Sequence, residues 1–93
     1  MREKEIERKL VQEVKKRGGL CPKWVSPGFA GVPDRIVFLP KMKIGFVEVK
    51  APGERPRKIQ LHRHERLREL GCKVYVLDNA NEIGGMLDDI QTA

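Results

Sequence analysis

The first part of the chain carries apolar residues at helical spacing among charged ones. They recur at steps of three and four residues: Ile6, Leu10, Val11 and Val14. This periodicity predicts an amphipathic helix over residues 2–17, which the glycine pair at 18–19 ends. A short strand is predicted at residues 20–25. Residues 26–33, which follow it, are rich in proline and glycine and are interpreted as a loop.

The rest of the chain alternates between strand-like and helical patterns. Three runs have the composition of strands: residues 35–39, 44–49 and 72–77. The first two strands are separated by only four residues, which favours a hairpin. A helix is predicted over about 56–70 and a last one over about 80–90, where Asn79 and Glu82 have the spacing of a capping box.

The predicted order of elements, α-β-β-β-α-β-α, combines a hairpin with a βαβ crossover. Both units fit one mixed sheet with helices packed on it, so we predict an α/β fold. The 93 residues are enough for one compact domain, and we expect it to span residues 1–93.

Charge and cysteine content narrow the function classes. Nineteen Lys and Arg against thirteen Asp and Glu leave a net charge of +6, which favours an anionic partner such as nucleic acid. Cys21 and Cys72 form no metal-binding CxxC pair and are interpreted as reduced thiols, with a disulfide left open. No apolar run approaches the roughly 20 residues of a membrane span, and no secretion signal is seen, so we expect a cytoplasmic protein with no membrane partner.

The candidate chemistry centres on the predicted hairpin. Glu48 and Lys50 are two residues apart on one strand, so their side chains leave the same face. Asp34 and Glu48 are equidistant from Lys41 in the turn, and a symmetric hairpin places them opposite each other, with Cβ atoms roughly 5 Å apart. Two carboxylates so close repel each other unless a cation lies between them. Carboxylate oxygens suit magnesium and manganese, so we predict a Mg²⁺ or Mn²⁺ site here.

The first predicted helix offers a third carboxylate. Around the helix axis Glu7 falls on the apolar face, between Val14 and Val11, and Glu3 falls on the same face nearer the helix end. A carboxylate on a buried face is unfavourable unless it is paired or bound to metal. Glu7 is therefore a candidate metal ligand, with Glu3 as the fallback. The alternative is that Glu7 merely sits at the edge of the apolar stripe.

One motif resembles the PD-(D/E)xK nuclease superfamily: Pro33-Asp34, then thirteen residues, then Glu48-Val49-Lys50. More narrowly, two segments are similar to the VRR-NUC family: Gly31-Val32-Pro33-Asp34-Arg35 and Val47-Glu48-Val49-Lys50. The resemblance extends over nearly the whole chain and includes these further matches: Glu7 to Val11, Gly18-Gly19, Lys23, Ser26-Pro27-Gly28 and Gln60. It implies a restriction-endonuclease-like αβββαβ core.

The resemblance also implies roles for individual residues. The metal ligands would be three carboxylates and one backbone carbonyl: Glu7, Asp34, Glu48 and the carbonyl of Val49. Lys50 matches the catalytic lysine of the family and acts together with Asp34 and Glu48. Gln60 matches a glutamine that faces the active site from the second long helix.

Several basic and polar residues are candidate nucleic-acid contacts. The resemblance and the position next to the motif indicate Lys23, Ser26 and Arg35. The basic loop after Lys50 adds Arg55, Arg57 and Lys58, for which a merely solvated loop is the alternative.

The second predicted helix also has an apolar face. Its apolar stripe contains Ile59, Leu67 and Leu70, with Gln60 at its flank and Arg63 within it. The two histidines of this helix point to different sides and are interpreted as surface or phosphate-contacting residues: His62 and His64.

Together these features predict a Mg²⁺- or Mn²⁺-dependent DNA endonuclease. Small stand-alone members of the family resemble Holliday-junction resolvases and act on branched DNA as homodimers, in bacteria and phage-infected cells. The resemblance therefore implies branched DNA and a second copy of the chain as partners. The alternatives are a nuclease for flaps, nicks or single strands, a basic DNA-binding module without catalysis, and acids that merely pair with Lys and Arg.

Overall fold

A three-stranded mixed sheet lies at the centre of the computed structural model, which describes all 93 residues. The elements in chain order are α1 (Glu3–Lys16), β1 (Arg35–Leu39), β2 (Lys43–Val49), α2 (Lys58–Glu69), β3 (Val74–Leu77), a 3₁₀ turn η1 (Ala80–Glu82) and α3 (Ile83–Gln91). The sheet order is β1-β2-β3, with β1 antiparallel and β3 parallel to β2. The predicted hairpin, crossover and α/β class are confirmed.

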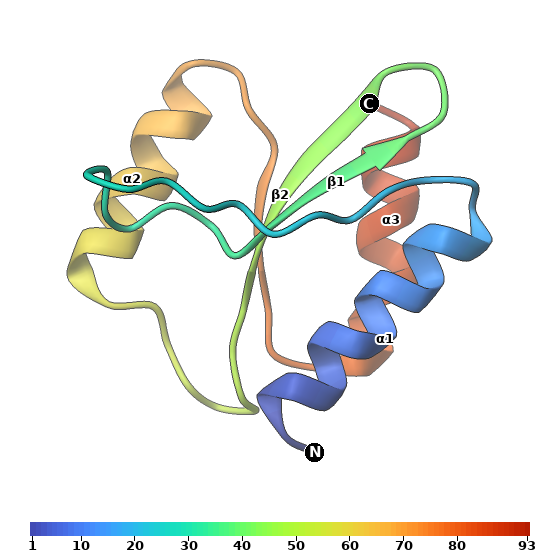
Figure 1. The fold of residues 1–93 in the computed structure, drawn as a ribbon, viewed down its shortest axis with the longest axis horizontal. Helices are drawn as coiled ribbons and strands as arrows, with labels where there is room; N and C mark the ends of the chain where they lie inside the picture. Colours follow the sequence, from blue (N-terminus) through green and yellow to red (C-terminus); the bar gives the residue numbers. More distant parts are fainter.

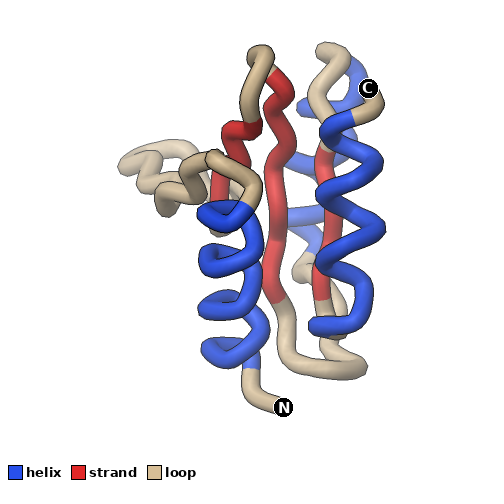
Figure 2. The backbone as a smooth tube through the Cα atoms, turned by 90° about the vertical axis from the view of Figure 1, so that its right-hand side faces the viewer, coloured by secondary structure: helices blue, strands red, loops and turns tan.

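Helices cover both faces of the sheet. Figure 1 shows α1 and α3 on one side of the strands and α2 on the other. Figure 2 is seen from the side of α1 and α3 and shows the strands behind these two helices. The apolar core lies between α1, α3 and the face of the sheet toward them. Strand and helix residues both contribute to it: Ile6, Leu10, Val14, Val37, Leu39, Val47, Val49, Leu77, Ile83, Met86, Leu87 and Ile90. The predicted stripe of α1 is thus buried, except that Val11 lies half-buried beside it.

The predicted strand at residues 20–25 is the one element that does not form. Only two isolated bridges link this segment to β1, from Leu20 to Phe38 and from Lys23 to Arg35. Pro22 lies between these bridges and has no backbone N–H, so a continuous ladder is interrupted. The segment still runs along the outer edge of β1, which its backbone partly covers.

The hairpin has the symmetric register that the sequence predicts. Arg35 pairs with Val47 and Leu39 pairs with Lys43, so every pair is equidistant from Lys41. The turn is tight enough that Lys41 and Met42 both adopt positive φ angles, of 67° and 60°. Continuing the register by one residue places Asp34, just before β1, opposite the Glu48 position of β2.

The predicted capping signal marks the start of a 3₁₀ turn, and α3 itself begins three residues later, at Ile83. The side chain of Asn79 accepts a hydrogen bond from the backbone N–H of Asn81 at 2.9 Å, which starts the 3₁₀ turn that leads into α3. At the other end of the domain, Arg17 follows α1 and donates to Asp88 of α3 at 2.8 Å, which ties the two helices together. None of the helices combines the length and the apolar composition needed to cross a membrane.

Replacing Gly19 should test how closely the chain after α1 approaches the sheet. A Cβ atom at Gly19 would lie 2.2 Å from the backbone oxygen of Phe38, so the Gly19→Ala substitution forces backbone to move. We expect it to lower the free energy of unfolding by roughly 1–3 kcal/mol. Gly84→Ala is the matched control, because a Cβ in that part of α3 meets nothing within 4 Å. It should raise stability by roughly 0.5–1 kcal/mol. Urea unfolding measures both, and a Gly19→Ala protein as stable as the parent would contradict the close approach.

Candidate active site

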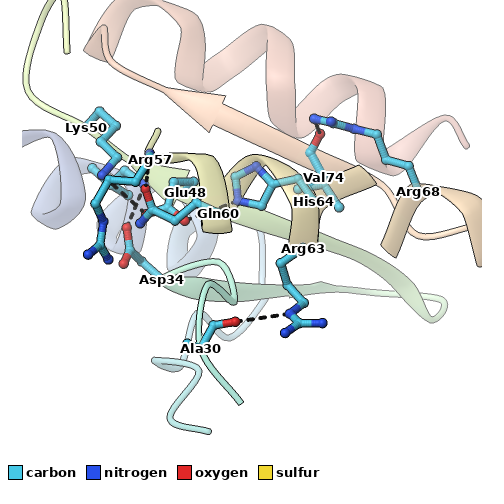
Figure 3. A network of polar contacts seen from close by, with 11 residues as sticks. Ala30, Asp34, Glu48, Lys50, Arg57, Gln60, Arg63, His64, Arg68 and Val74 are labelled. Atoms are coloured by element: carbon cyan, nitrogen blue, oxygen red, sulfur yellow. Dashed lines mark hydrogen bonds and ion pairs between the residues drawn. The ribbon is translucent and has the colours of Figure 1, made fainter. Parts of the chain in front are cut away.

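Asp34 and Glu48 meet at one end of the hairpin. The Asp34 carboxylate accepts a hydrogen bond from the backbone N–H of Val49 at 2.8 Å, which holds it against β2 beside Glu48 (Figure 3). Glu48 is the more enclosed of the two, because its side chain is only 1% exposed. The structure therefore brings together the two carboxylates that the hairpin register predicts to be neighbours.

The environment of Glu48 favours its protonated form. The pKa of Glu48 is raised to about 8, first by burial and then by the hydrogen bond and negative charge of Asp34. The charge of Lys50 opposes this shift, and its Nζ lies 4.0 Å from Glu48 Oε2. Two carboxylates that retain a proton between them are a donor set that suits a divalent cation, which would relieve the same repulsion. The Asp34 and Glu48 oxygens thus fit Mg²⁺ or Mn²⁺.

Glu7 is not brought to this pair. Its carboxylate accepts a hydrogen bond from Arg35 Nε at 2.8 Å, and the same guanidinium donates to the Cys21 carbonyl at 2.9 Å. The physical reason is strand alternation: Arg35 follows Asp34, so its side chain leaves the opposite face and reaches α1. No group of three or more His, Cys, Asp or Glu side chains is arranged to hold a metal ion.

Glu3, one helical turn before Glu7, bears on the site instead. Its negative charge is one of the causes that raise the pKa of Glu48, and Glu7 is not. Of the two candidate carboxylates of α1, it is therefore Glu3, the fallback of the sequence prediction, whose charge acts on Glu48.

The two cysteines are free in the structure. Burial raises the pKa of the Cys21 thiol to about 11, and the nearby Glu7 carboxylate adds to the shift against the opposing charge of Arg35. Cys21 is therefore an unreactive thiol at neutral pH, in agreement with the interpretation of reduced cysteines.

The side of α2 that faces the sheet is polar, contrary to the helical-wheel prediction. The residues of α2 that are buried are Gln60 and His64. Of the three residues that the wheel placed in an apolar stripe, Ile59 and Leu70 are 45% and 63% exposed, and only Leu67 is partly buried. The part of the sheet under α2 carries Glu48, and a buried carboxylate requires donors, so the polar residues of the helix turn toward it.

Gln60 makes two contacts that fix its amide. The backbone N–H of Arg57, at the start of α2, donates to Gln60 Oε1 at 2.8 Å. An amide N–H cannot be an acceptor, so the oxygen of the side chain must face Arg57 and its nitrogen must face Glu48. Gln60 Nε2 then donates to Glu48 Oε2 at 3.1 Å (Figure 3).

His64 is a part of the site that the sequence interpretation missed. It is completely buried rather than a surface residue, and its Nε2 lies 3.2 Å from Glu48 Oε1. Burial lowers the pKa of His64, and the positive charge of Arg68 lowers it further, so the imidazole is neutral at neutral pH. The signal in the sequence was the four-residue spacing from Gln60, which places both side chains on one helical face.

Lys50 lies at the C-terminal end of β2. Its backbone N–H donates to the Leu77 carbonyl of β3 at 2.9 Å, so the residue is anchored to the sheet although it follows the last paired position. Its side chain is 14% exposed and lies on the same face as Glu48. A cation anchored beside the two carboxylates can bind a phosphate oxygen or a water molecule at this place.

The predicted nucleic-acid contacts fall into two groups. Lys23 and Arg35 line a cleft of about 430 Å³ with Lys4 and Arg8 of α1, although Arg35 is largely occupied by Glu7. The second group lies in the exposed loop before α2 and at its start: Arg55, Arg57 and Lys58. Ser26 is partly exposed, in the loop that leads to Asp34.

The loop before Asp34 is held against α2. Arg63 donates to the Ala30 carbonyl at 3.1 Å (Figure 3), and its guanidinium carbon lies 3.6 Å from the centre of the Phe29 ring. Gly31 has a φ of +82°, and a Cβ there would lie 2.6 Å from the Ile59 carbonyl. The glycine of the GVPDR segment is thus required because the loop packs directly on the backbone of α2.

The comparisons with known proteins agree with this arrangement, although no protein-family model matches the chain. "Putative nuclease p44" of Acyrthosiphon pisum secondary endosymbiont phage 1 is 58% identical over 79 residues, which are 85% of this chain and 85% of that protein. A solved structure described as "VRR_NUC domain" matches with a TM-score of 0.86 and 31% sequence identity, over 92% of this chain and 94% of that chain. The chain therefore belongs to the VRR-NUC family of nucleases.

Proposed function

We propose that the protein is a Mg²⁺- or Mn²⁺-dependent endonuclease that hydrolyses phosphodiester bonds of DNA. The observation that carries the proposal is the buried Glu48 carboxylate, which lies beside Asp34 and 4.0 Å from the Lys50 ammonium group. The name of the phage relative and the description of the solved structure support the nuclease assignment.

The side chains of the site have separate tasks in this proposal. Asp34 and Glu48 hold the cation, and the Val49 carbonyl, as the family resemblance implies, is a further ligand. A bound Mg²⁺ supplies Lewis acidity toward the phosphoryl oxygen and lowers the pKa of bound water. The Lys50 ammonium group orients the attacking water and stabilises negative charge that develops on the phosphate. Gln60 holds Glu48 through the 3.1 Å hydrogen bond.

We assign the contacts with the DNA backbone to the predicted basic residues. A net charge of +6 attracts DNA, and cations at fixed places select where its phosphates lie. Lys23 lines the cleft beside α1, and Arg55, Arg57 and Lys58 belong to the exposed loop before α2 and its start. Ser26 and the free part of Arg35 contribute weaker contacts, because Arg35 already binds Glu7.

We propose further that the substrate is branched DNA and that the active form is a homodimer. Each chain has one candidate site, so two symmetric nicks at a junction require two copies. An apolar row crosses the hairpin edge, because Leu20 bridges to Phe38 and Phe38 pairs with Ile44. Their exposed fractions are 70%, 37% and 40%, which supports this row as a contact between copies.

Metal dependence is tested by incubating the protein with labelled four-way, flap, single-stranded and linear DNA, with Mg²⁺, Mn²⁺ or EDTA. We expect cleavage only with metal, and a loss of roughly 10²–10⁴-fold in rate for Asp34→Asn and Lys50→Met with DNA binding retained. Lys15→Met, an equal change of charge on the exposed side of α1, is the control. If none of the substrates is cleaved, the proposed enzyme activity is wrong and a DNA-binding module is the remaining alternative.

The same assay decides which α1 carboxylate serves the metal. Because Glu3 acts on Glu48 electrostatically and Glu7 is bound by Arg35, we expect Glu3→Gln to weaken Mg²⁺ activation and Glu7→Gln to leave it nearly intact. The two substitutions remove the same charge from neighbouring turns of one helix, so each is the control of the other. The reverse result would show that Glu7 leaves Arg35 when metal binds.

The dimer is tested by placing a charge in the apolar row. Phe38→Lys should give a monomer in sedimentation equilibrium and should reduce paired incision of a four-way junction more than nicking of a flap. Leu61→Lys alters another exposed apolar residue, 50% exposed on α2, and should leave the assembly unchanged. A parent protein that is monomeric at the concentrations of the cleavage assay contradicts the dimer, and preferred cleavage of flaps or single strands contradicts the junction substrate.

A further inference from the structure

The buried residues of α2 contact a single hydrogen-bond acceptor, the Glu48 carboxylate. These residues, Gln60 and His64, are one helical turn apart and both point toward Glu48 (Figure 3). Gln60 approaches Oε2 at 3.1 Å and His64 approaches Oε1 at 3.2 Å. The two oxygens of Glu48 therefore each have a partner from the same rigid helix.

Packing alone does not explain a histidine at position 64. The side chain has no exposed surface, and its Nδ1 is the one buried side-chain nitrogen or oxygen in the protein without a hydrogen-bond partner. Enclosing an unpaired polar atom costs free energy, which an apolar side chain of similar size would avoid. What a histidine supplies and an apolar residue does not is the contact from Nε2 to Glu48.

We propose that His64 is a positioning residue that, together with Gln60, fixes the Glu48 carboxylate in the orientation needed to bind the metal ion. The inference rests on the proposed function of the site. The terminal torsion of a glutamate side chain is intrinsically broad, so a single donor leaves the carboxylate plane free to rotate. Two donors, one on each oxygen, define that plane.

The arrangement leaves room for the cation. Each carboxylate oxygen has two lone-pair directions, and Gln60 and His64 use one on each oxygen. The two remaining directions are open to Lys50 and a metal ion. His64 thus acts through Glu48 and is not itself a ligand, in the way that groups behind a metal ligand set its orientation.

The test is Mn²⁺ binding to the full chain without DNA, measured by isothermal titration calorimetry. His64→Leu removes the donor and keeps an apolar side chain of similar size, and it should weaken Mn²⁺ binding by roughly 10- to 100-fold. His64→Gln carries an amide nitrogen close to the place of Nε2 and should restore most of the affinity. His64→Asn has a shorter side chain that does not reach Glu48 and should not restore it. His62→Leu, on the exposed side of the same helix, is the matched control and should bind as the parent does.

The outcomes separate the inference from the proposed function. Equal Mn²⁺ affinity for the parent and His64→Leu overturns the role of His64 and leaves the nuclease proposal intact. Equal affinities for His64→Gln and His64→Asn overturn it as well, and this comparison holds even where His64→Leu does not fold. A parent chain that binds no Mn²⁺ and cleaves no DNA overturns both proposals.

The tautomer of His64 gives a second readout that needs no substrate. In the Mg²⁺-saturated protein the Glu48 carboxylate can only accept, so the proton of the neutral imidazole should be on Nε2. Long-range ¹H–¹⁵N spectra of histidine-labelled protein identify this tautomer. A proton on Nδ1 would place two lone pairs against each other at the Glu48 contact and would overturn the donor role.

Discussion

Burial of the Glu48 carboxylate is the constraint around which this small protein is built. A carboxylate that is 1% exposed has lost nearly all of its water, and the protein must replace that water with donors or positive charge. Gln60 and His64 supply donors from α2, and Lys50 supplies a charge from the end of β2. The neighbouring Asp34 does the opposite, since its own charge adds to the raised pKa of Glu48. The structure keeps two acids together although their charges repel, and we propose that a divalent cation relieves this repulsion.

The two faces of the sheet have different roles. Toward α1 and α3 the strands present valine and leucine, and this face forms the apolar core that stabilises the fold. Toward α2 the sheet carries Glu48, and the helix buries Gln60 and His64 against it, while Ile59 and Leu70 are exposed. Because successive strand residues point to opposite faces, Val47 and Val49 can belong to the core while Glu48 between them belongs to the site. A site built on a paired strand is held as firmly as the core itself.

Loops bring the remaining parts of the site into place by close backbone packing. Gly31 allows the loop before Asp34 to lie on the Ile59 carbonyl, and Arg63 holds the same loop through Ala30 and Phe29. The same helix that orients Glu48 therefore also locates the segment that carries Asp34.

The sequence by itself determined the features that depend on local backbone periodicity. The stripe of α1, the glycine stop at 18–19 and the hairpin register that sets Asp34 against Glu48 all follow from spacings along the chain. Tertiary structure decided the contacts between elements, which sequence spacings do not specify. The interruption at Pro22, the capture of Glu7 by Arg35 and the burial of His64 depend on which surface each element meets. Hydrophobicity assigned α2 an apolar face, but the helix turned polar residues inward because the sheet beneath it carries a buried carboxyl group that needs hydrogen-bond partners.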